Sequence, residues 1–146
     1  MEDKRGLGKL ELVYTIFCDD VRLEAGNRLS LMGIIPNMIM VQQLPVTMIK
    51  FAVVHRWRGE GGHLSEVRIL TPDRQTPVVI SQPTRFEIAE GGFADNISFF
   101  VNLTFDTPGR YWVQTLIDST LFEEQPLLVV DARAVQETED FSDSVN

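Results

Sequence analysis

The feature that most constrains the fold of this chain is a two-residue alternation of apolar and polar side chains. It is clearest from Asn96 to Asp106, where apolar residues occupy the odd positions and only Phe100 interrupts the polar side. Successive side chains of a β-strand point to opposite faces of the sheet, so this pattern predicts a strand with one buried face. No segment of helical length shows the spacing of an amphipathic helix. The sequence therefore predicts an all-β protein.

Turn-forming residues separate this strand from other segments with strand-like composition. Pro36 divides two of them, and Pro126 predicts an edge strand or a bulge because proline cannot donate to a strand ladder. Many short strands joined by turns are typical of an antiparallel two-sheet sandwich, and we expect an immunoglobulin-like one with about nine strands. The other candidate strands are Leu10–Cys18, Arg28–Ile34, Met38–Val41, Met48–Arg58, Leu64–Leu70, Pro77–Ile80, Thr84–Ala89, Arg110–Asp118 and Leu121–Val130.

Three segments carry specific turn signals. The glycine-rich segment Gly59–His63 predicts a hairpin loop that sets Arg56 opposite Glu66, and Asp118–Thr120 predicts a second hairpin near the end of the domain. The segment Asp106–Tyr111 resembles the corner of immunoglobulin-like domains, in which a tyrosine hydroxyl bonds to backbone a few residues upstream. A plain Pro-Gly turn would explain the same residues without that bond.

Length and charge predict one domain and disfavour nucleic acid. The chain has 146 residues, of which 44% are hydrophobic, and a net charge of −8. We expect a flexible N-terminus over residues 1–9, a single β-sandwich domain over 10–130 and a flexible acidic tail over 131–146. No cluster of lysines and arginines is present, so a phosphate backbone finds no complementary surface.

The sequence also predicts a cytoplasmic protein without a membrane segment. The N-terminus has no apolar region typical of a secretion signal, and polar residues and Pro36 interrupt the most apolar stretch, Leu29–Val46. The single cysteine, Cys18, cannot form an internal disulfide, which fits a reducing compartment.

A short acidic segment is a candidate calcium site. Asp19, Asp20 and Glu24 lie within six positions, and Ca²⁺ prefers clusters of carboxylate oxygens. The alternative is a loop in which the aspartates accept hydrogen bonds from backbone N–H groups. A calcium-dependent binding domain is therefore one of the functions that the sequence leaves open.

Aromatic and cationic residues suggest a ligand platform. Trp57 and Trp112 could stack on a carbohydrate or another small ligand, with Arg56 and Arg58 supplying hydrogen bonds. The alternative is that these arginines are solvated strand residues paired with acids. The platform requires at least one exposed tryptophan beside a concave surface.

A methionine-rich stretch suggests a docking edge. Met38 and Met40 alternate with aliphatic residues, and methionine is common at adaptable binding surfaces as well as in ordinary cores. No nucleophile, general base or metal-ligand spacing can be named, since His55 and His63 have no signature around them. We therefore expect no cofactor and no enzymatic activity. The leading hypothesis is a protein-interaction or structural module that binds a protein partner or itself.

Several short motifs together resemble a known family. They are the aromatic-Cys-Asp-Asp-Val-Arg motif at 17–22, the segment Gly26–Gly33, the Pro-Gly-x-Tyr motif at 108–111 and the Pro-Leu-x-Val motif at 126–129. This set resembles an uncharacterised family of small bacterial single-domain β proteins over residues from about 10 to 130. The resemblance implies an intracellular β protein of unknown function and transfers no catalytic or ligand-binding residue.

Overall fold

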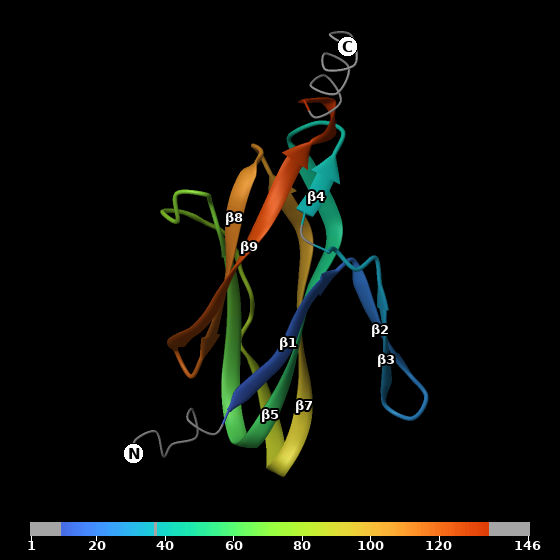
Figure 1. Cartoon of the computed structure of the whole chain (residues 1–146), viewed down its shortest axis with the longest axis vertical. Coiled ribbons are helices and arrows are strands. Elements are labelled where there is room, and N and C mark those ends of the chain that lie inside the picture. The colour runs from blue at the N-terminus through green and yellow to red at the C-terminus, as the bar shows by residue number, and fades with distance from the viewer. Residues whose placement is uncertain (1–9, 37, 135–146) are drawn as a thin grey trace, which may run out of the picture.

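The computed structural model describes residues 10–36 and 38–134, and its regular structure is almost entirely β (Figure 1). The all-β prediction is therefore confirmed. Within the described residues, the only helix is one turn over residues 132–134. The strands are β1 (Glu11–Cys18), β2 (Asp20–Glu24), β3 (Arg28–Met32), β4 (Met38–Val41), β5 (Val46–Leu70), β6 (Pro77–Ile80), β7 (Thr84–Phe105), β8 (Gly109–Ile117) and β9 (Thr120–Asp131).

Seven of these strands form one mixed sheet in the order β1-β5-β8-β9-β4, with β6 and β7 also paired to β5. The strands β2 and β3 form a separate hairpin. The predicted antiparallel pairing is correct for every described pair except β4 and β9, which run parallel. These two strands are far apart in the chain, so no tight turn forces them into opposite directions.

The long strands β5 and β7 form a ribbon that bends sharply where both are rich in glycine. Gly59, Gly61 and Gly91 have positive φ angles of 146°, 94° and 72°, and the pairing register shifts between Gly59 and Gly61. Residues other than glycine rarely adopt these backbone conformations. In Figure 1 the ribbon turns back at the bottom of the molecule, so each strand runs through both halves of one curled sheet.

This bend corrects the predicted hairpin at Gly59–His63. The segment is not a hairpin loop: β5 continues through it as one bent strand from Val46 to Leu70, and the two halves pair with other strands instead of with each other. Arg56 therefore lies opposite Asp95 instead of Glu66, and Glu66 lies opposite Leu116. Glycine permits a corner as readily as a loop, and the long-range pairing partners decide between the two.

The hydrophobic core lies between the two halves of the curled sheet. Its largest cluster combines Phe51 and Val53 from the first half of β5 with Val67 and Ile69 from the second half. A second cluster surrounds Trp57 near the bend. The core thus consists of inward-facing side chains from one continuous sheet instead of from two separate sheets. The long strands β5 and β7 each contribute to both halves of this sheet.

The strand with the clearest alternation changes face at Asn102. Leu103 and Phe105 are buried as predicted, but Phe99 and Val101 are 54% and 71% exposed, and Phe100 is buried in their place. Asn102 has a φ of 53°, and it has no pairing partner in a ladder that is otherwise regular from Phe99 to Phe105. Since side chains alternate with a period of two, a change at one position moves the odd-numbered residues on its N-terminal side from the inner to the outer face and the even-numbered ones to the inner face.

The hairpin of β2 and β3 covers part of the outer face of the sheet. Val21 and Leu31 pack against a small cluster formed by Cys18, Ala52 and Val54. The sequence pattern predicts a loop over Asp19–Glu24, and the structure instead has the strand β2 there. Val21 and Leu23 alternate with polar residues, but the segment is too short for this signal to stand out.

The predicted hairpin at Asp118–Thr120 is present. Asp118 and Ser119 have φ angles of 51° and 69° and connect β8 to β9 as a hairpin.

Pro126 lies where β9 pairs with β8 alone, because β4 begins its pairing at Leu128. Of the predicted acidic tail, Asp131 belongs to β9; residues 135–146, like residues 1–9, lie outside the described residues.

The corner at Tyr111 contains the hydroxyl-to-backbone bond that was one of the two expectations for this segment. The hydroxyl of Tyr111 donates to the carbonyl oxygen of Thr107 at 2.7 Å, and the ring packs edge-on against Phe105. We expect Tyr111→Phe to lower the free energy of unfolding by about 1 kcal/mol, since the change removes this bond. Urea unfolding measures the loss.

The matched control is Tyr14→Phe. Tyr14 is partly buried against the outer cluster, and no hydrogen bond of its hydroxyl is present in the described part of the chain. Its replacement should change stability by less than about 0.5 kcal/mol. Equal effects of the two substitutions would contradict a stabilising role for the Tyr111 corner.

Candidate functional site

The predicted tryptophan platform does not form around Trp57. Its side chain has no exposed surface and stacks between His55 and Phe86, with ring centroids 5.5 and 5.6 Å away. A ligand at the surface cannot reach it. Trp57 lies among the buried residues near the bend of the β5–β7 ribbon, where the apolar period places it on the inner face.

The two arginines beside it on β5 are paired with acids on neighbouring strands. Arg56 forms an ion pair with Asp95 at 3.2 Å, and its guanidinium lies 4.6 Å from the ring centre of Phe93. Arg58 forms an ion pair with Glu11. The strand register places Arg58 opposite Glu11 and Arg56 opposite Asp95. This arrangement agrees with the alternative interpretation, in which the arginines are solvated strand residues paired with acids.

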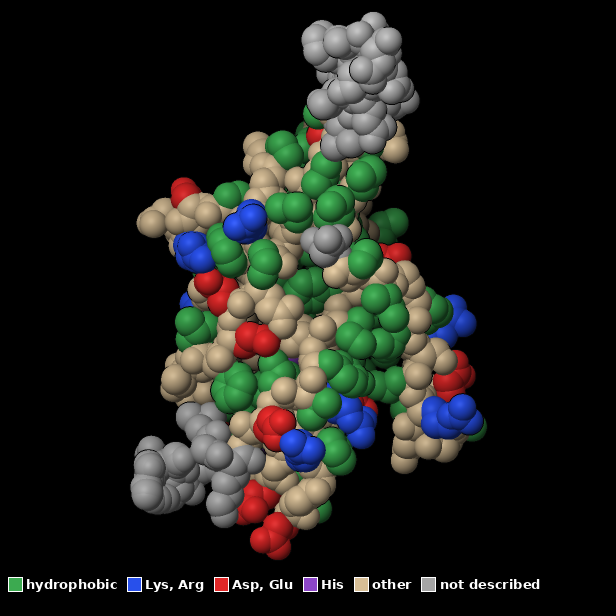
Figure 2. Space-filling model, in the orientation of Figure 1, with side chains coloured by type: hydrophobic (Ala, Val, Ile, Leu, Met, Phe, Trp, Pro, Cys, Tyr) green, Lys and Arg blue, Asp and Glu red, His purple; other side chains and the backbone are tan. Residues whose placement is uncertain are grey.

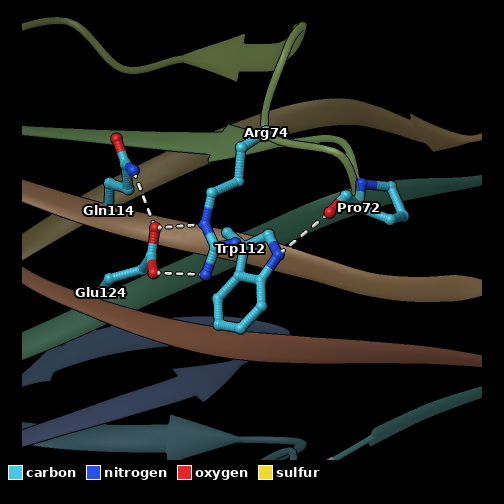
Figure 3. Close-up of polar contacts among 5 residues, drawn as sticks. All are labelled: Pro72, Arg74, Trp112, Gln114 and Glu124. Atoms are coloured by element: carbon cyan, nitrogen blue, oxygen red, sulfur yellow. Dashed lines mark hydrogen bonds and ion pairs between the residues drawn. The ribbon is translucent and has the colours of Figure 1, made fainter.

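The second tryptophan is covered by a cation instead of being open to a ligand. Figure 3 shows Arg74 lying over Trp112, with the guanidinium carbon 3.7 Å from the ring centre. The indole N–H of Trp112 donates to the carbonyl oxygen of Pro72 at 3.3 Å. Arg74 also donates to both carboxylate oxygens of Glu124, and Gln114 donates to the same carboxylate. This network joins the β5–β6 turn to the β8–β9 hairpin.

We expect Arg74→Ala to raise the pKa of Glu124 toward its ordinary value. The hydrogen bonds from Arg74 are the main cause of the lowered pKa of this carboxyl, and the bond from Gln114 is the second cause. Gln114→Ala should therefore produce a smaller rise. An NMR titration of the glutamate side chains measures both. A larger rise in the Gln114 variant would contradict this order.

The three carboxylates of the candidate calcium site do not converge. Asp20 accepts hydrogen bonds from the backbone of Val21 and from Lys50, and these contacts lower the pKa of its carboxyl, the backbone bond most. Glu24 lies at the far end of β2, about 13 Å along the strand, and accepts a hydrogen bond from Ser30. Among residues 10–36 and 38–134, no group of three His, Cys, Asp or Glu side chains is placed to hold a metal ion.

The methionine-rich stretch is partly core and partly surface. On β4, Ile39 and Val41 are buried, Met38 is half-buried, and Met40 is 55% exposed. The strand pairs only with β9, so its second edge has no partner in the described part of the structure. Ile39 and Val41 therefore belong to the core, whereas Met40 lies on the surface at this edge.

A longer edge lies along the second half of β7. From Gly92 to Phe105 this strand pairs with β5 on one side, and no strand among the described residues pairs with its other side. Phe93, Phe99 and Val101 on this strand are all at least half exposed. They continue an apolar outer face that runs across Cys18 and Ala52 to Phe99.

The outer face is visibly apolar. Figure 2 shows hydrophobic side chains gathered on the body of the molecule where β1 ends beside the β2–β3 hairpin. The charged side chains of this region, Lys50 with Asp20 and Arg56 with Asp95, form ion pairs at its margins. The alternating pattern assigns Phe99 and Val101 to the buried face, so it does not reveal them as surface residues. The adjacent pair Phe99–Phe100 is the signal that both faces of this strand carry aromatic residues.

A layer of polar side chains crosses the core between the two apolar clusters. Its members face inward between core residues on β5, β7 and β8, and all are at least nine-tenths buried: His55, Ser65, Asn96, Ser98 and Thr115. His55 and Thr115 share a hydrogen bond of 3.0 Å, whereas Nδ1 of His55, Oγ of Ser65 and Nδ2 of Asn96 have no partner among the described residues. Such groups are typical positions for internal water.

This layer has the chemistry of a neutral core. Burial lowers the pKa of His55 to about 4, so its ring is uncharged at neutral pH. The other histidine, His63, has one ring nitrogen 3.2 Å from the carboxylate of Asp118 and the other 3.0 Å from the carbonyl oxygen of Glu60. The contact with Asp118 joins the end of the glycine corner to the β8–β9 turn, whereas the contact with Glu60 stays within β5.

One concave surface lies between β1 and β9. It has a volume of about 380 Å³ and is lined by Thr15–Phe17, by Ile34–Pro36 and by Gln125 and Pro126. The size suits a small ligand, but only Thr15 and Gln125 offer polar side-chain atoms. A hydrogen bond from Thr15 to Glu123 already joins the two walls.

None of the helical structure in the described residues is long and apolar enough to cross a membrane. The described residues define an all-β fold with an apolar outer face and a strand edge that no other described strand pairs with. The chain belongs to a family of unknown function, DUF6941, whose model matches residues 13–130. This match confirms the resemblance to an uncharacterised family. A comparison with curated proteins finds no match.

Two solved structures share the fold at low sequence identity. One is an alkylpurine DNA glycosylase, AlkC, from Pseudomonas fluorescens bound to DNA containing an abasic site analog, with a TM-score of 0.53 and 8% identity. The other is a β-glucosidase from Listeria innocua in complex with isofagomine, with a TM-score of 0.50 and 12% identity. Each match covers 84% of this chain but only 30% and 16% of the respective larger chains. These similarities concern the fold alone.

Proposed function

We propose that this protein is a non-enzymatic interaction module that binds a strand of a protein partner along the free edge of β7. The observation that carries the proposal is the coincidence of an unpaired strand edge with exposed apolar side chains on the same strand. An unpaired edge presents a row of backbone N–H and C=O groups, which another extended segment can satisfy.

The β7 edge lacks the charged residues and prolines by which many sheet proteins block such pairing. Between Asn96 and Phe105 it carries no lysine, no proline and no charged residue. Natural edges are usually short, charged or covered. The edge of β4 is only four residues long, and β1 is already bridged at Phe17 by Ile35. Among these edges, β7 offers the longest uncharged template.

The exposed side chains add a driving force to the backbone template. Phe99 and Val101 are 54% and 71% exposed, and burial of a large apolar side chain is worth about 1.5–3 kcal/mol. Adjacent apolar residues of the outer face would extend the contact. The ligand-platform alternative has less support, because Trp57 is buried and Arg74 covers Trp112.

Two finer proposals accompany this function. The bond between Tyr111 and Thr107 supports an immunoglobulin-like arrangement of the strands. A cytoplasmic location is supported by Cys18, a fully buried free thiol whose pKa is raised by burial.

Phe99→Lys should abolish partner binding by the protein in the cells that express it. A lysine at this position charges the edge and removes the apolar side chain. Size-exclusion chromatography of a clarified lysate, with detection of this chain, should show the native protein above its monomer mass of 16.6 kDa. The Phe99→Lys variant should elute at the monomer position.

The matched control is Leu121→Lys. Leu121 is 52% exposed on β9, away from the β7 edge, so the control carries the same change at similar exposure. It should elute with the native protein. A native chain that elutes as a monomer, or two variants that behave alike, would refute binding through β7.

A further inference from the structure

We infer that the partner at the β7 edge is a second copy of this chain, paired antiparallel through the same seven residues, Asn96–Asn102, around a twofold axis at Phe99. The inference rests on the proposed function and names its partner. Twofold contacts are self-complementary: the same patch must fit itself when it is turned around. Within this segment, the residues Ile97–Val101 meet this condition on both faces of the strand.

On the outer face, the twofold places like beside like. Phe99 lies opposite Phe99 of the partner subunit, and Ile97 lies opposite a valine, the partner's Val101. Cross-strand pairs of aromatic and of β-branched residues are among those that stabilise antiparallel sheets. Phe99 and Val101 are more than half exposed in the single chain, so the pairing would bury surface that is now in water.

On the inner face, the same axis pairs a small residue with a large one. Ser98 lies opposite the partner's Phe100, and the relation repeats by symmetry. A shift of the axis by one residue toward the C-terminus would bring two buried Phe100 side chains together on the crowded inner face. The segment ends at Asn102, where the strand changes face.

The charges favour a second copy over a charged foreign segment. Asn96–Asn102 contains no charged residue, so self-pairing sets no like charges opposite each other. The nearest charged side chains are satisfied within their own chain, Asp95 by Arg56 and Lys50 by Asp20. A charged partner would therefore find no unpaired charge at this edge.

The pairing also continues the apolar outer face. Within one chain, the row formed by Cys18, Ala52 and Phe99 ends at the free edge. The twofold joins this row to the same row of the second copy. Three strands on each side, β1, β5 and β7, thereby become a continuous six-stranded surface without an exposed edge at its centre.

Light scattering on the purified full chain tests the inference. We expect a mass of twice 16.6 kDa for the native protein and for Leu121→Lys, and the monomer mass for Phe99→Lys. In a second variant, Phe99→Cys, mild oxidation should link two chains covalently, because residues opposite each other in an antiparallel pair lie within disulfide reach. Leu121→Cys should remain unlinked, and Cys18 is too buried to compete.

A native protein that is monomeric at every concentration would overturn the inference. So would a dimer that survives Phe99→Lys and is not linked through Cys at position 99. If the purified chain is a monomer while its larger size in the lysate still depends on Phe99, the second copy is excluded and the proposed function stands. If neither measurement depends on Phe99, both fail.

Discussion

Replacement of Trp57 by alanine should lower the free energy of unfolding by about 4 kcal/mol. The side chain is fully buried and contacts three aromatic rings, those of His55, Phe86 and Phe122. Its removal opens a cavity in the cluster beside the bend of the β5–β7 ribbon, and large-to-small changes of this kind cost about 3–5 kcal/mol. Since small domains have about 5–15 kcal/mol in total, the variant should be close to unfolding. Urea or thermal unfolding measures the loss.

Trp57→Phe is the control for this prediction. The indole N–H has no hydrogen-bond partner among the described residues, so phenylalanine loses packing volume without breaking a bond. It should cost less than half as much as alanine. A small effect of Trp57→Ala would mean that the side chain is not in the core, and it would reopen a role for Trp57 in ligand binding.

Stability should fall by about 2 kcal/mol between about pH 8 and about pH 5 because of His55 alone. Burial lowers the pKa of this histidine from 6.5 to about 4. The unfolded chain therefore binds the proton before the folded chain does, so the contribution is complete above pH 6.5 and is lost as the pH falls toward 4. Urea unfolding at a series of pH values measures the slope.

His55→Gln isolates this effect. Glutamine can still bond to Thr115, but it does not titrate, so the variant should lose most of the pH dependence in this range. Carboxyls whose pKa is lowered in the fold, such as those of Glu124 and Asp131, lose their contribution only as the pH falls through and below the ordinary pKa of a carboxyl, which lies below this window. A native protein whose stability is the same at pH 8 and pH 5 would show that His55 is not buried in its neutral form.

Local pattern predicted the strands well and their partners poorly. The alternation around Asn96–Asp106 and the breaks at Pro36 and Asp118–Thr120 were sufficient to place most elements. Gly59–Gly62 could be a loop or a corner on local grounds, because glycine allows both backbones. Only the pairing of β5 with β1, β7 and β8 selects the corner, and those contacts join distant parts of the chain.

The candidate site depended on one backbone conformation that the pattern could not reveal. Asn102 has a left-handed backbone, which asparagine tolerates better than most residues, and the strand changes face there. Phe99 and Val101 thereby move from the predicted core to the surface. The residues that the sequence favoured, Trp57 and Arg56 in particular, are instead held inside the core or in an ion pair.

The most direct test of the interaction through β7 is photo-crosslinking in the cells that express the protein. A photoreactive residue is placed at position 99, and in a second protein at position 121 as the control. We predict a crosslinked product, identified by mass spectrometry, at position 99 and none at position 121. The absence of a product at position 99, or equal products at both positions, would contradict the proposed binding along this edge.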